Sequence, residues 1–276
     1  MAETAYTIQY RSEYIPGFEQ RKSLLSEMVT NEAVVKGNQA TFLIADSGSA
    51  TTTTRGVNGR IQSRGDNNTQ NTATLTEEHD LVEKTGFNVF ASQGDQRRIM
   101  QETSYGTVGR KMDDQILTAL SAGTQTQGAA ATASLLMFTR AKAILGNAAV
   151  PNDGNVCAVI SPAAHAYLMG VPEFTSADYV NDKHNVSAPQ MFRWAGMTFI
   201  EHPNISGIGT SSETLYVFHK SAIGHATDTG GMQVYAGYDE EQDYSWARCS
   251  LYMGAKLLQN SGVVKITHDG SALAAV

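Results

Sequence analysis

Apolar positions recur at helical spacing through one long segment, residues 95–122. The apolar residues that share one face of this segment are Ile99, Val108, Met112, Ile116 and Leu120. The sequence SQGD just before the run supplies capping residues, and Gly123 ends it. At 1.5 Å of rise per residue, a helix of this length spans about 40 Å. We therefore predict one long helix, with a bend where Gly106 and Gly109 interrupt the pattern.

Polar positions dominate a second segment, which precedes this helix. Residues 41–44 (TFLI) predict a short strand, and the main apolar residues of the following segment, 46–75, are Val57, Ile61 and Leu75. Its threonine-rich flanks favour extended chain, whereas its Gly and Asn pairs are typical of turns. The segment therefore predicts a long two-stranded hairpin that projects from the body. Such a hairpin is not stable alone and needs another surface to lie on.

The remaining apolar patterns predict a helical arm at the start of the chain and a mixed region after the long helix. Phe18, Leu24, Leu25 and Met28 fall at roughly helical spacing in the first forty residues. After a joint at 124–132, residues 130–230 alternate helices with strands. The predicted helices begin at residues 135 and 162, and the predicted strands are 156–160, 197–200 and 215–218, with a loop at 181–189.

The last part of the chain returns to strand patterns. Residues 232–238 predict one strand, and residues 244–253 alternate after an acidic turn at 239–243. Residues 260–262 (NSG) predict a hairpin turn, with 263–267 as the returning strand. The predicted fold class is therefore α+β.

Composition and charge favour an assembly over a binder of nucleic acid. The chain has a net charge of −7, a pI near 5.5 and only 17% charged residues, whereas dedicated nucleic-acid-binding domains are usually basic. It has no apolar run of membrane-spanning length and no signal-like start, so we expect it to remain in the cytoplasm. Cys157 and Cys249 lack metal-binding spacing and are expected to be reduced, buried thiols.

The sequence holds no catalytic or metal-binding arrangement that outweighs a structural reading. It has no G-x-S-x-G elbow, and Cys157 lies in an apolar strand where a thiol is inert. His219 and His225 have no neighbouring cysteine, so we expect no metal and no cofactor. The basic residues that could meet phosphate from the long helix are Arg97, Arg98, Arg110 and Lys111. Their positions are equally consistent with a solvent-exposed face of this helix that has no ligand.

Four segments resemble those of tailed-bacteriophage major capsid proteins, which have the Hong Kong 97 capsid fold. They are VCAVISPAAHAYLMGVPEFTSADYV (156–180), MTFIEHPNISG (197–207), YVFHKSAIGHA (216–226) and GYDEEQDYSWARCSLYMGAKLLQNSGVVKI (237–266). The order of the predicted elements is also that of the family. The resemblance implies an N-terminal arm (1–40), an extended hairpin loop (41–85), a peripheral-domain sheet with the long spine helix (86–129 and 235–276) and an inserted α/β axial domain (130–234).

The resemblance also implies a function and partners. The chain would be a non-enzymatic capsid subunit that assembles as pentamers and hexamers into an icosahedral shell around double-stranded DNA. It would assemble in the host bacterial cytoplasm and reside in the virion capsid, with a separate scaffolding protein, a portal and, as an option, a decoration protein. DNA contact would be weak and non-specific, through the four basic residues of the long helix at the inner surface, and there would be no membrane.

The extended loop would supply the subunit interface. Its candidate interface residues are Arg55, Val57, Arg60, Ile61, Arg64 and Asp66. Some family members cross-link a loop lysine to an asparagine, but here no lysine lies between Lys36 and Lys84. The open alternatives are a tail or tube protein, a non-viral encapsulating shell protein of the same fold, and a hydrolase on the α/β region.

Overall fold

The computed structural model describes residues 17–35, 37–92, 95–175 and 191–273. The chain divides into two compact units, each built from three separate stretches of sequence. The first unit contains Met1–Ser23, Glu77–Met112 and Gly230–Tyr252, and the second contains Leu24–Thr76, Asp113–Thr229 and Met253–Val276. The loop expected at 181–189 and the first sixteen residues of the expected arm lie outside the described residues.

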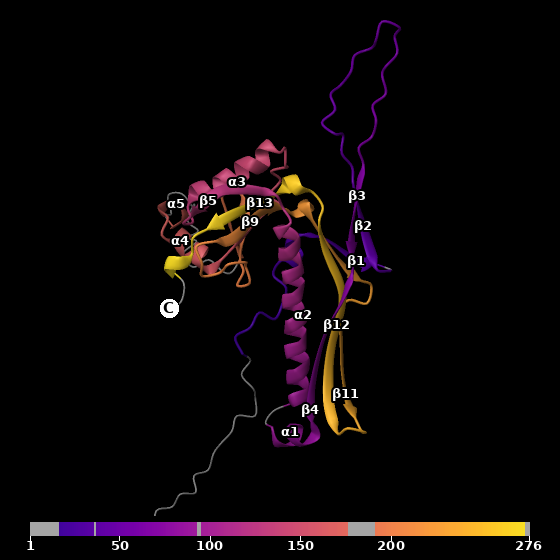
Figure 1. The fold of residues 1–276 in the computed structure, drawn as a ribbon, viewed down its shortest axis with the longest axis vertical. Coiled ribbons are helices and arrows are strands. Elements are labelled where there is room, and N and C mark those ends of the chain that lie inside the picture. Colours follow the sequence, from indigo (N-terminus) through magenta and orange to yellow (C-terminus); the bar gives the residue numbers. More distant parts are fainter. Residues whose placement is uncertain (1–16, 36, 93–94, 176–190, 274–276) are drawn as a thin grey trace, which may run out of the picture. The chain divides into compact units, whose positions relative to one another are not determined.

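One long helix and three long strands make up most of the first unit (Figure 1). The helix is α2 (Gln96–Ser121), and the strands are β4 (Thr76–Thr85), β11 (Gln233–Asp239) and β12 (Tyr244–Leu257). Both β4 and β11 pair with β12, and β11 runs antiparallel to it with Gln233 opposite Ser250. A short helix, α1 (Gly86–Ala91), joins β4 to the segment before α2. The last residues of α2 and β12 belong to the second unit.

Local capping explains where α2 begins and ends. The Asp95 carboxylate accepts a hydrogen bond from the Arg98 N–H at 3.2 Å, which satisfies one free donor of the first turn. The Gly123 N–H donates to the Leu120 carbonyl at 3.0 Å and closes the last turn. The long helix predicted from the apolar spacing is confirmed to within a residue at each end.

A six-stranded sheet forms the body of the second unit. Its order is β5 (Gln125–Ala131), β13 (Val263–His268), β9 (Glu213–His219), β6 (Val156–Ile160), β8 (Met197–Glu201) and β7 (Met191–Trp194). The helices of this unit are α3 (Leu135–Asn147), α4 (Pro162–Met169) and α5 (Pro172–Thr175). Ser161 caps α4 by accepting the Ala164 N–H at 3.1 Å, as its Ser-Pro start predicts.

Aromatic side chains fill the core of this sheet. Phe138 on α3 meets Phe199 on β8 edge to face at 5.1 Å, and Phe192 on β7 stacks on Phe199 at the same distance. Every residue of β6 is buried. This burial explains why the uninterrupted apolar sequence VCAVI predicted a buried strand.

The strand predicted at 263–267 is present as β13, but its predicted pairing was wrong, and so was the joint predicted at 124–132. Residues 263–268 do not fold back on β12 as a hairpin, because residues 260–262 form a 3₁₀ turn and β13 pairs with β9 and β5. Val263, Val264 and Ile266 are thereby fully buried. The joint expected at 124–132 is in fact β5, whose glutamines and alanines have low strand propensity and become a strand only by pairing with β13.

The described part of the expected helical arm is not helical beyond one 3₁₀ turn. Ser26–Met28 forms that turn, and β1 (Thr30–Val35) follows as a strand parallel to β10 (Ile223–Asp228). Leu25 is fully buried, whereas Phe18 is fully exposed. Pairing with the edge of β10 therefore makes Thr30–Val35 a strand in place of the expected helical arm.

Two properties expected from composition can be compared with the described residues. None of their helices is long and apolar enough to cross a membrane. Cys157 and Cys249 are both free and buried. Burial raises the pKa of the Cys157 thiol to about 11 and also raises that of Cys249, so neither is an activated thiolate at neutral pH.

Candidate subunit interface

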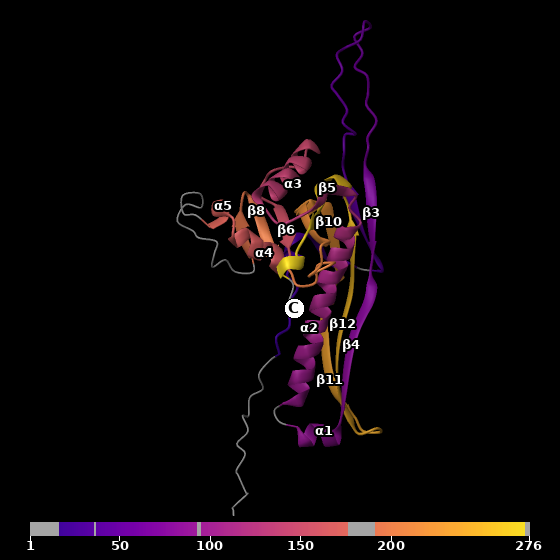
Figure 2. The ribbon, with the colours of Figure 1, turned by 60° about the vertical axis from the view of Figure 1, so that its left-hand side comes forward.

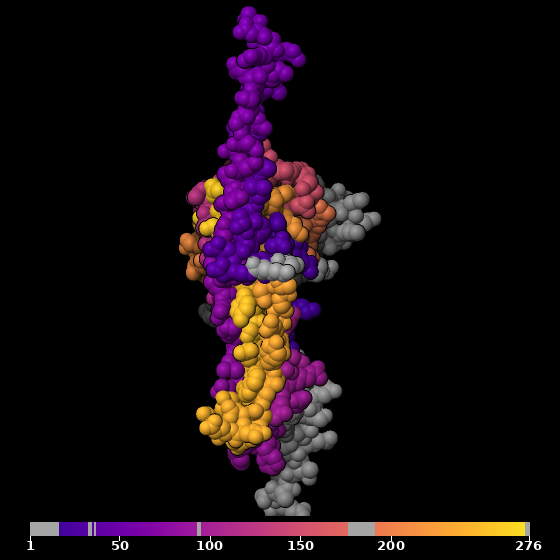
Figure 3. Space-filling model, turned by 90° about the vertical axis from the view of Figure 1, so that its right-hand side faces the viewer, coloured from indigo at the N-terminus to yellow at the C-terminus, as the bar shows by residue number. Residues whose placement is uncertain are grey.

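The polar segment between residues 45 and 68 extends beyond a short antiparallel ladder. β2 (Gln39–Ile44) pairs with β3 (Thr69–Thr74), with Gln39 opposite Thr74 and Ile44 opposite Thr69. Figures 1 and 2 show the chain continuing past this ladder as two long arms, and Figure 3 shows them as a thin projection. The predicted two-stranded hairpin is therefore limited to its base, since residues 45–68 contain no strand. We call residues 45–68 the extended loop.

The base of the extended loop is packed within the second unit. Phe42 approaches Gly224 so closely that a Cβ at that glycine would lie 2.9 Å from the ring. Asn71 donates to the Leu258 carbonyl at 2.7 Å. A Cβ at Gly254 would overlap the carbonyl of Thr74. These contacts fix where the loop leaves the unit.

The extended loop itself is exposed at every residue. Gly56 and Gly59 close a turn at its tip, where the Gly56 N–H donates to the Arg60 carbonyl at 3.1 Å and the Gly59 N–H donates to the Gly56 carbonyl at 2.8 Å. Val57 and Ile61 flank this turn with 107% and 66% of their surface exposed. The tip therefore presents two apolar side chains to solvent.

The polar candidates of the loop bond only within the loop among the described residues. Arg55 reaches the Gly59 carbonyl at 3.5 Å, and Arg64 reaches the Ser47 carbonyl at 3.1 Å. Asp66 accepts the Asn67 N–H at 3.1 Å and the Asn68 amide at 2.6 Å. The guanidinium of Arg60 has no side-chain partner in the described chain. The structure thus brings the six candidates together on one projection but gives them no surface to bind.

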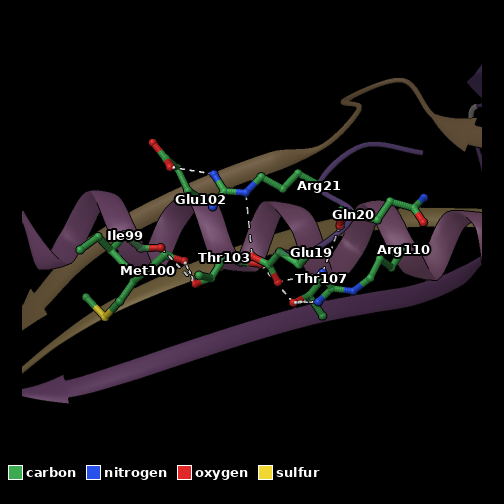
Figure 4. A network of polar contacts seen from close by, with 9 residues as sticks. All are labelled: Glu19, Gln20, Arg21, Ile99, Met100, Glu102, Thr103, Thr107 and Arg110. Atoms are coloured by element: carbon green, nitrogen blue, oxygen red, sulfur yellow. Dashed lines mark hydrogen bonds and ion pairs between the residues drawn. The ribbon is translucent and has the colours of Figure 1, made fainter. Parts of the chain in front are cut away.

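The four basic candidates on α2 have partners inside the first unit. Figure 4 shows Arg110 donating to Glu19 at 3.0 Å and to the Gln20 carbonyl at 3.1 Å. Arg98 bonds Glu102 at 2.9 Å, four residues along the helix. The weaker contacts are Arg97 with Ser245 at 3.4 Å and Lys111 with Glu78 at 3.8 Å. These pairs reduce the positive charge available for phosphate.

These pairs also hold the chain before Ser23 against α2. Arg21 bonds Glu102 at 3.3 Å and Glu19 bonds Arg110 at 3.0 Å (Figure 4). In the sequence of α2, Gly106 and Gly109 lie between Glu102 and Arg110. A Cβ at Gly109 would lie 3.0 Å from the Arg21 carbonyl oxygen, whereas one at Gly106 would lie 3.6 Å from Arg21 Cα. The helix continues unbroken through both positions. The glycines therefore admit a crossing chain.

The two glycines provide a matched pair of variants. Gly106→Ala should raise the thermal midpoint, because alanine favours a helix by about 1 kcal/mol and its methyl group would make only ordinary van der Waals contacts, the nearest at 3.6 Å. Gly109→Ala should lack this gain or lower the midpoint, because its methyl group meets a backbone oxygen that cannot rotate away. Thermal unfolding of both purified variants measures the difference. Equal midpoints would show that the chain before Ser23 does not press on Gly109.

Buried carboxylate pairs are the polar feature that sequence reasoning missed. Asp113 and His202 are fully buried and 3.1 Å apart, and the Asp113 carboxylate also accepts the N–H groups of Leu24 and Leu25 at 3.0 and 3.1 Å. The Asn204 N–H donates to Nδ1 of His202, so Nε2 carries the proton that faces Asp113. No local motif could have revealed this pairing.

A second buried carboxylate ties together four parts of the second unit. Glu213 accepts hydrogen bonds from Ser161 at 2.5 Å, from His268 at 2.7 Å and from the Gly209 N–H at 2.9 Å. A Cβ at Gly270 would overlap this carboxylate. These contacts join Ser161, Gly209 and His268 to one buried carboxylate, and Nε2 of His268 is buried without a hydrogen-bond partner in the described chain.

One trio, in which Asp153 and Ser221 are exposed and His219 is buried, has the residue types of a hydrolase. His219 bonds Asp153 through Nε2 at 3.1 Å and Ser221 through Nδ1 at 2.7 Å. Hydrogen bonds from the Asn155 backbone, the Asn155 amide and His219 lower the pKa of Asp153 to about 2. The Ser221 N–H also donates to Nδ1 at 3.3 Å, so the imidazole of His219 caps the 3₁₀ turn that contains Ser221. Among the described residues no acidic, histidine or cysteine cluster could hold a metal ion.

Comparisons with known proteins identify a family for this chain and solved structures that share its fold. A family model described as "Phage capsid protein" matches residues 2–270. No curated protein matches the chain significantly. The fold is shared with a solved structure from Mycobacterium phage Che8 (17% identity, TM-score 0.75, 96% of this chain and 98% of that one). It is also shared with the capsid of Ralstonia phage GP4 (12% identity, TM-score 0.72, 96% of this chain and 96% of that one). The capsid of cyanophage Pam1 has the same fold (10% identity, TM-score 0.73, 98% of each chain).

Proposed function

This chain belongs to the phage capsid protein family, and from that premise we propose that its extended loop closes the shell by packing on another copy. The chain is a major capsid protein, and many copies form the phage shell. The protein is located in the virion capsid. The proposal concerns which part of the chain makes the contacts between copies.

The exposure of the extended loop carries this proposal. All residues 45–68 are exposed, although Val57 and Ile61 are apolar and the base of the loop is tightly packed. Ordering backbone costs about 1–2 kcal/mol per residue, and the loop alone has few contacts to offset that cost. Burial of the two apolar side chains and pairing of the arginines with acids on another copy would offset it.

We propose the domain roles along the same lines. Residues 1–40 would be an arm, 41–85 an extended hairpin region that includes the extended loop, 86–129 and 235–276 a peripheral domain and 130–234 an axial domain. The gathering of α2, β11 and most of β12 in the first unit supports the peripheral assignment. Because β13 pairs with β9, residues 263–268 fit the axial domain better than the peripheral one.

The remaining partners follow from charge and from the class of protein. Packaged double-stranded DNA would be contacted weakly, because α2 shares its basic side chains with Glu19, Glu78 and Glu102. A separate scaffolding protein, a portal and a decoration protein would be the other partners. The subunit would assemble in the host bacterial cytoplasm and would act without catalysis, with Ser221 held in the turn that His219 caps.

A substitution at the loop tip tests the proposal. Val57→Asp with Ile61→Asp should prevent closed shells, because two charges would enter a desolvated contact at several kcal/mol each if unpaired. The control is Thr51→Asp with Thr53→Asp, which adds the same charge to the flank of the loop and should still give shells. Negative-stain microscopy of particles from expressing cells reads the result. Normal shells from the tip variant would contradict the proposal.

A further inference from the structure

We propose that the extended loop docks on an acidic cap of a second copy, formed by the β11–β12 turn and α1. We define the acidic cap by its residues: Asp239, Glu240, Glu241 and Asp243 of the turn, with Phe87 and Phe90 of α1. This inference rests on the proposed function, because it names the surface that receives the loop. It adds that the recognition is electrostatic at the turn and apolar at α1.

The acidic cap carries four carboxylates within five residues, and among the described residues two of them have no side-chain partner. Asp239 accepts the N–H groups of Glu241 and Gln242 at 2.9 and 3.1 Å, and Asp243 accepts the Tyr238 hydroxyl at 2.6 Å. Glu240 and Glu241 are exposed and have no side-chain partner among the described residues. Their carboxylates are therefore available to a partner, whereas the two aspartates shape the turn.

Neighbouring side chains show that the field at this turn is negative. The pKa of Tyr238 is raised, first by its hydrogen bond to Asp243 and further by the charges of Asp243 and Glu240. The pKa of Tyr244 is raised by desolvation and by the charge of Asp239. The charge of Arg97 acts on the pKa of Tyr238 in the opposite direction, but it is the smallest of the influences on that group, so the turn remains negative overall.

An apolar surface lies directly beside these acids. The Gly86 N–H, at the start of α1, donates to the Asp243 carbonyl at 2.9 Å, which fixes α1 next to the turn. Figures 1 and 2 show α1 and the turn that joins β11 to β12 at the same end of the first unit. Phe87 and Phe90 are 74% and 87% exposed. Exposed aromatic pairs of this kind commonly mark an interface.

The extended loop is the segment of this chain that complements the cap. Residues 55–64 carry three arginines and no acid, and residues 239–243 carry four acids and no base. The loop arginines alternate with Val57 and Ile61, just as the acids of the cap adjoin two phenylalanines. Arginine suits this role, because its planar guanidinium binds carboxylates with two hydrogen bonds. A second copy of the chain is therefore the occupant.

A zero-length cross-link tests the contact directly. The loop contains no lysine, so Arg60→Lys introduces one amine there without changing its charge. Shells assembled from equal amounts of isotopically heavy and light Arg60→Lys subunits are treated with carbodiimide, which joins an amine only to a touching carboxylate. We expect mixed heavy–light peptides that join position 60 to Glu240 or Glu241. Such peptides should be absent from dissociated subunits.

The outcomes separate this inference from the proposed function. Mixed peptides that join position 60 to other carboxylates would overturn the acidic cap but keep the loop as an interface. Peptides from within one subunit only, in closed shells, would overturn both.

Charge reversal gives an independent readout. Arg60→Glu alone and Glu240→Arg/Glu241→Arg alone should each reduce the yield of shells, and their combination should restore it. The control is Glu77→Arg/Asp114→Arg, which reverses two exposed acids elsewhere and should not rescue Arg60→Glu. Failure of the first combination to rescue, with both parents defective, would contradict pairing at the cap.

Discussion

A subunit in which a short Gly-Ser turn replaces residues 46–67 should fold and stay soluble, and should not form closed shells. The replacement keeps β2 and β3, so the buried residues Ala40 and Ala73 retain their packing. It removes an extended loop that is exposed at every residue and that adds no core to the chain. Assembly would then lose its apolar tip and its three arginines together. Sedimentation and electron microscopy of the purified variant measure the loss.

The comparison variant replaces residues 49–53 alone by serines of equal number. It removes the threonine-rich flank but keeps the tip from Arg55 to Arg64, so shells should still form. If the loop-replaced protein assembles as well as the wild type, the extended loop is dispensable. If the replaced protein is unfolded by circular dichroism, the loop has a folding role that its exposure does not suggest.

Asp113→Ala should lower the free energy of unfolding by about 3–5 kcal/mol, as expected when one member of a buried polar pair is removed. The fully buried carboxylate accepts two backbone N–H groups, from Leu24 and Leu25, and the Nε2–H of His202. Alanine would leave these three donors buried without an acceptor, each at a cost of about 1–3 kcal/mol before relaxation. Urea denaturation of the unassembled subunit measures the change.

The adjacent aspartate supplies the control for this prediction. Asp114 is exposed, so Asp114→Ala should change stability by no more than about 0.5 kcal/mol. Asp113→Asn, which keeps one acceptor oxygen, should fall between the two alanine variants. Similar denaturation midpoints for Asp113→Ala and Asp114→Ala would show that the buried pair contributes little to stability.

Local patterns in the sequence predicted those elements in which apolar spacing, capping residues and terminating residues all favour the same secondary structure. α2 has apolar spacing, an aspartate cap and a terminal glycine, and β6 is an unbroken apolar run bounded by a turn and a Ser-Pro helix start. Such elements need little information from elsewhere in the chain. The strands β6, β8, β9 and β13 of the second unit were likewise placed by their apolar residues.

Elements that depend on a distant partner were not predictable in the same way. β5 is a run of Gln, Thr, Gly and Ala that pairs with β13, which lies far along the chain. β1 follows residues at helical spacing and becomes a strand because β10 offers it an edge. In both cases tertiary pairing decides between local structures of similar free energy.

The interface candidates were predictable by contrast, and the buried polar pairs were not. A long polar stretch that contains Val57, Ile61 and three arginines is conspicuous because it lacks the apolar residues of a core. Asp113 and His202 carry no such signal, since each sits in an ordinary helical or strand-end context and only the fold joins them. The acidic turn at 239–243 was visible as a charge cluster, but its neighbour α1 was not.

Limited trypsin digestion before and after assembly tests the central claim most directly, namely that the extended loop is covered by another copy in the shell. Arg55, Arg60 and Arg64 are exposed tryptic sites in the isolated subunit. The account predicts that the isolated subunit is cut first at these three positions, and that closed shells at the same trypsin ratio resist cleavage there. Equal rates of cleavage at these arginines in subunits and in shells would contradict it.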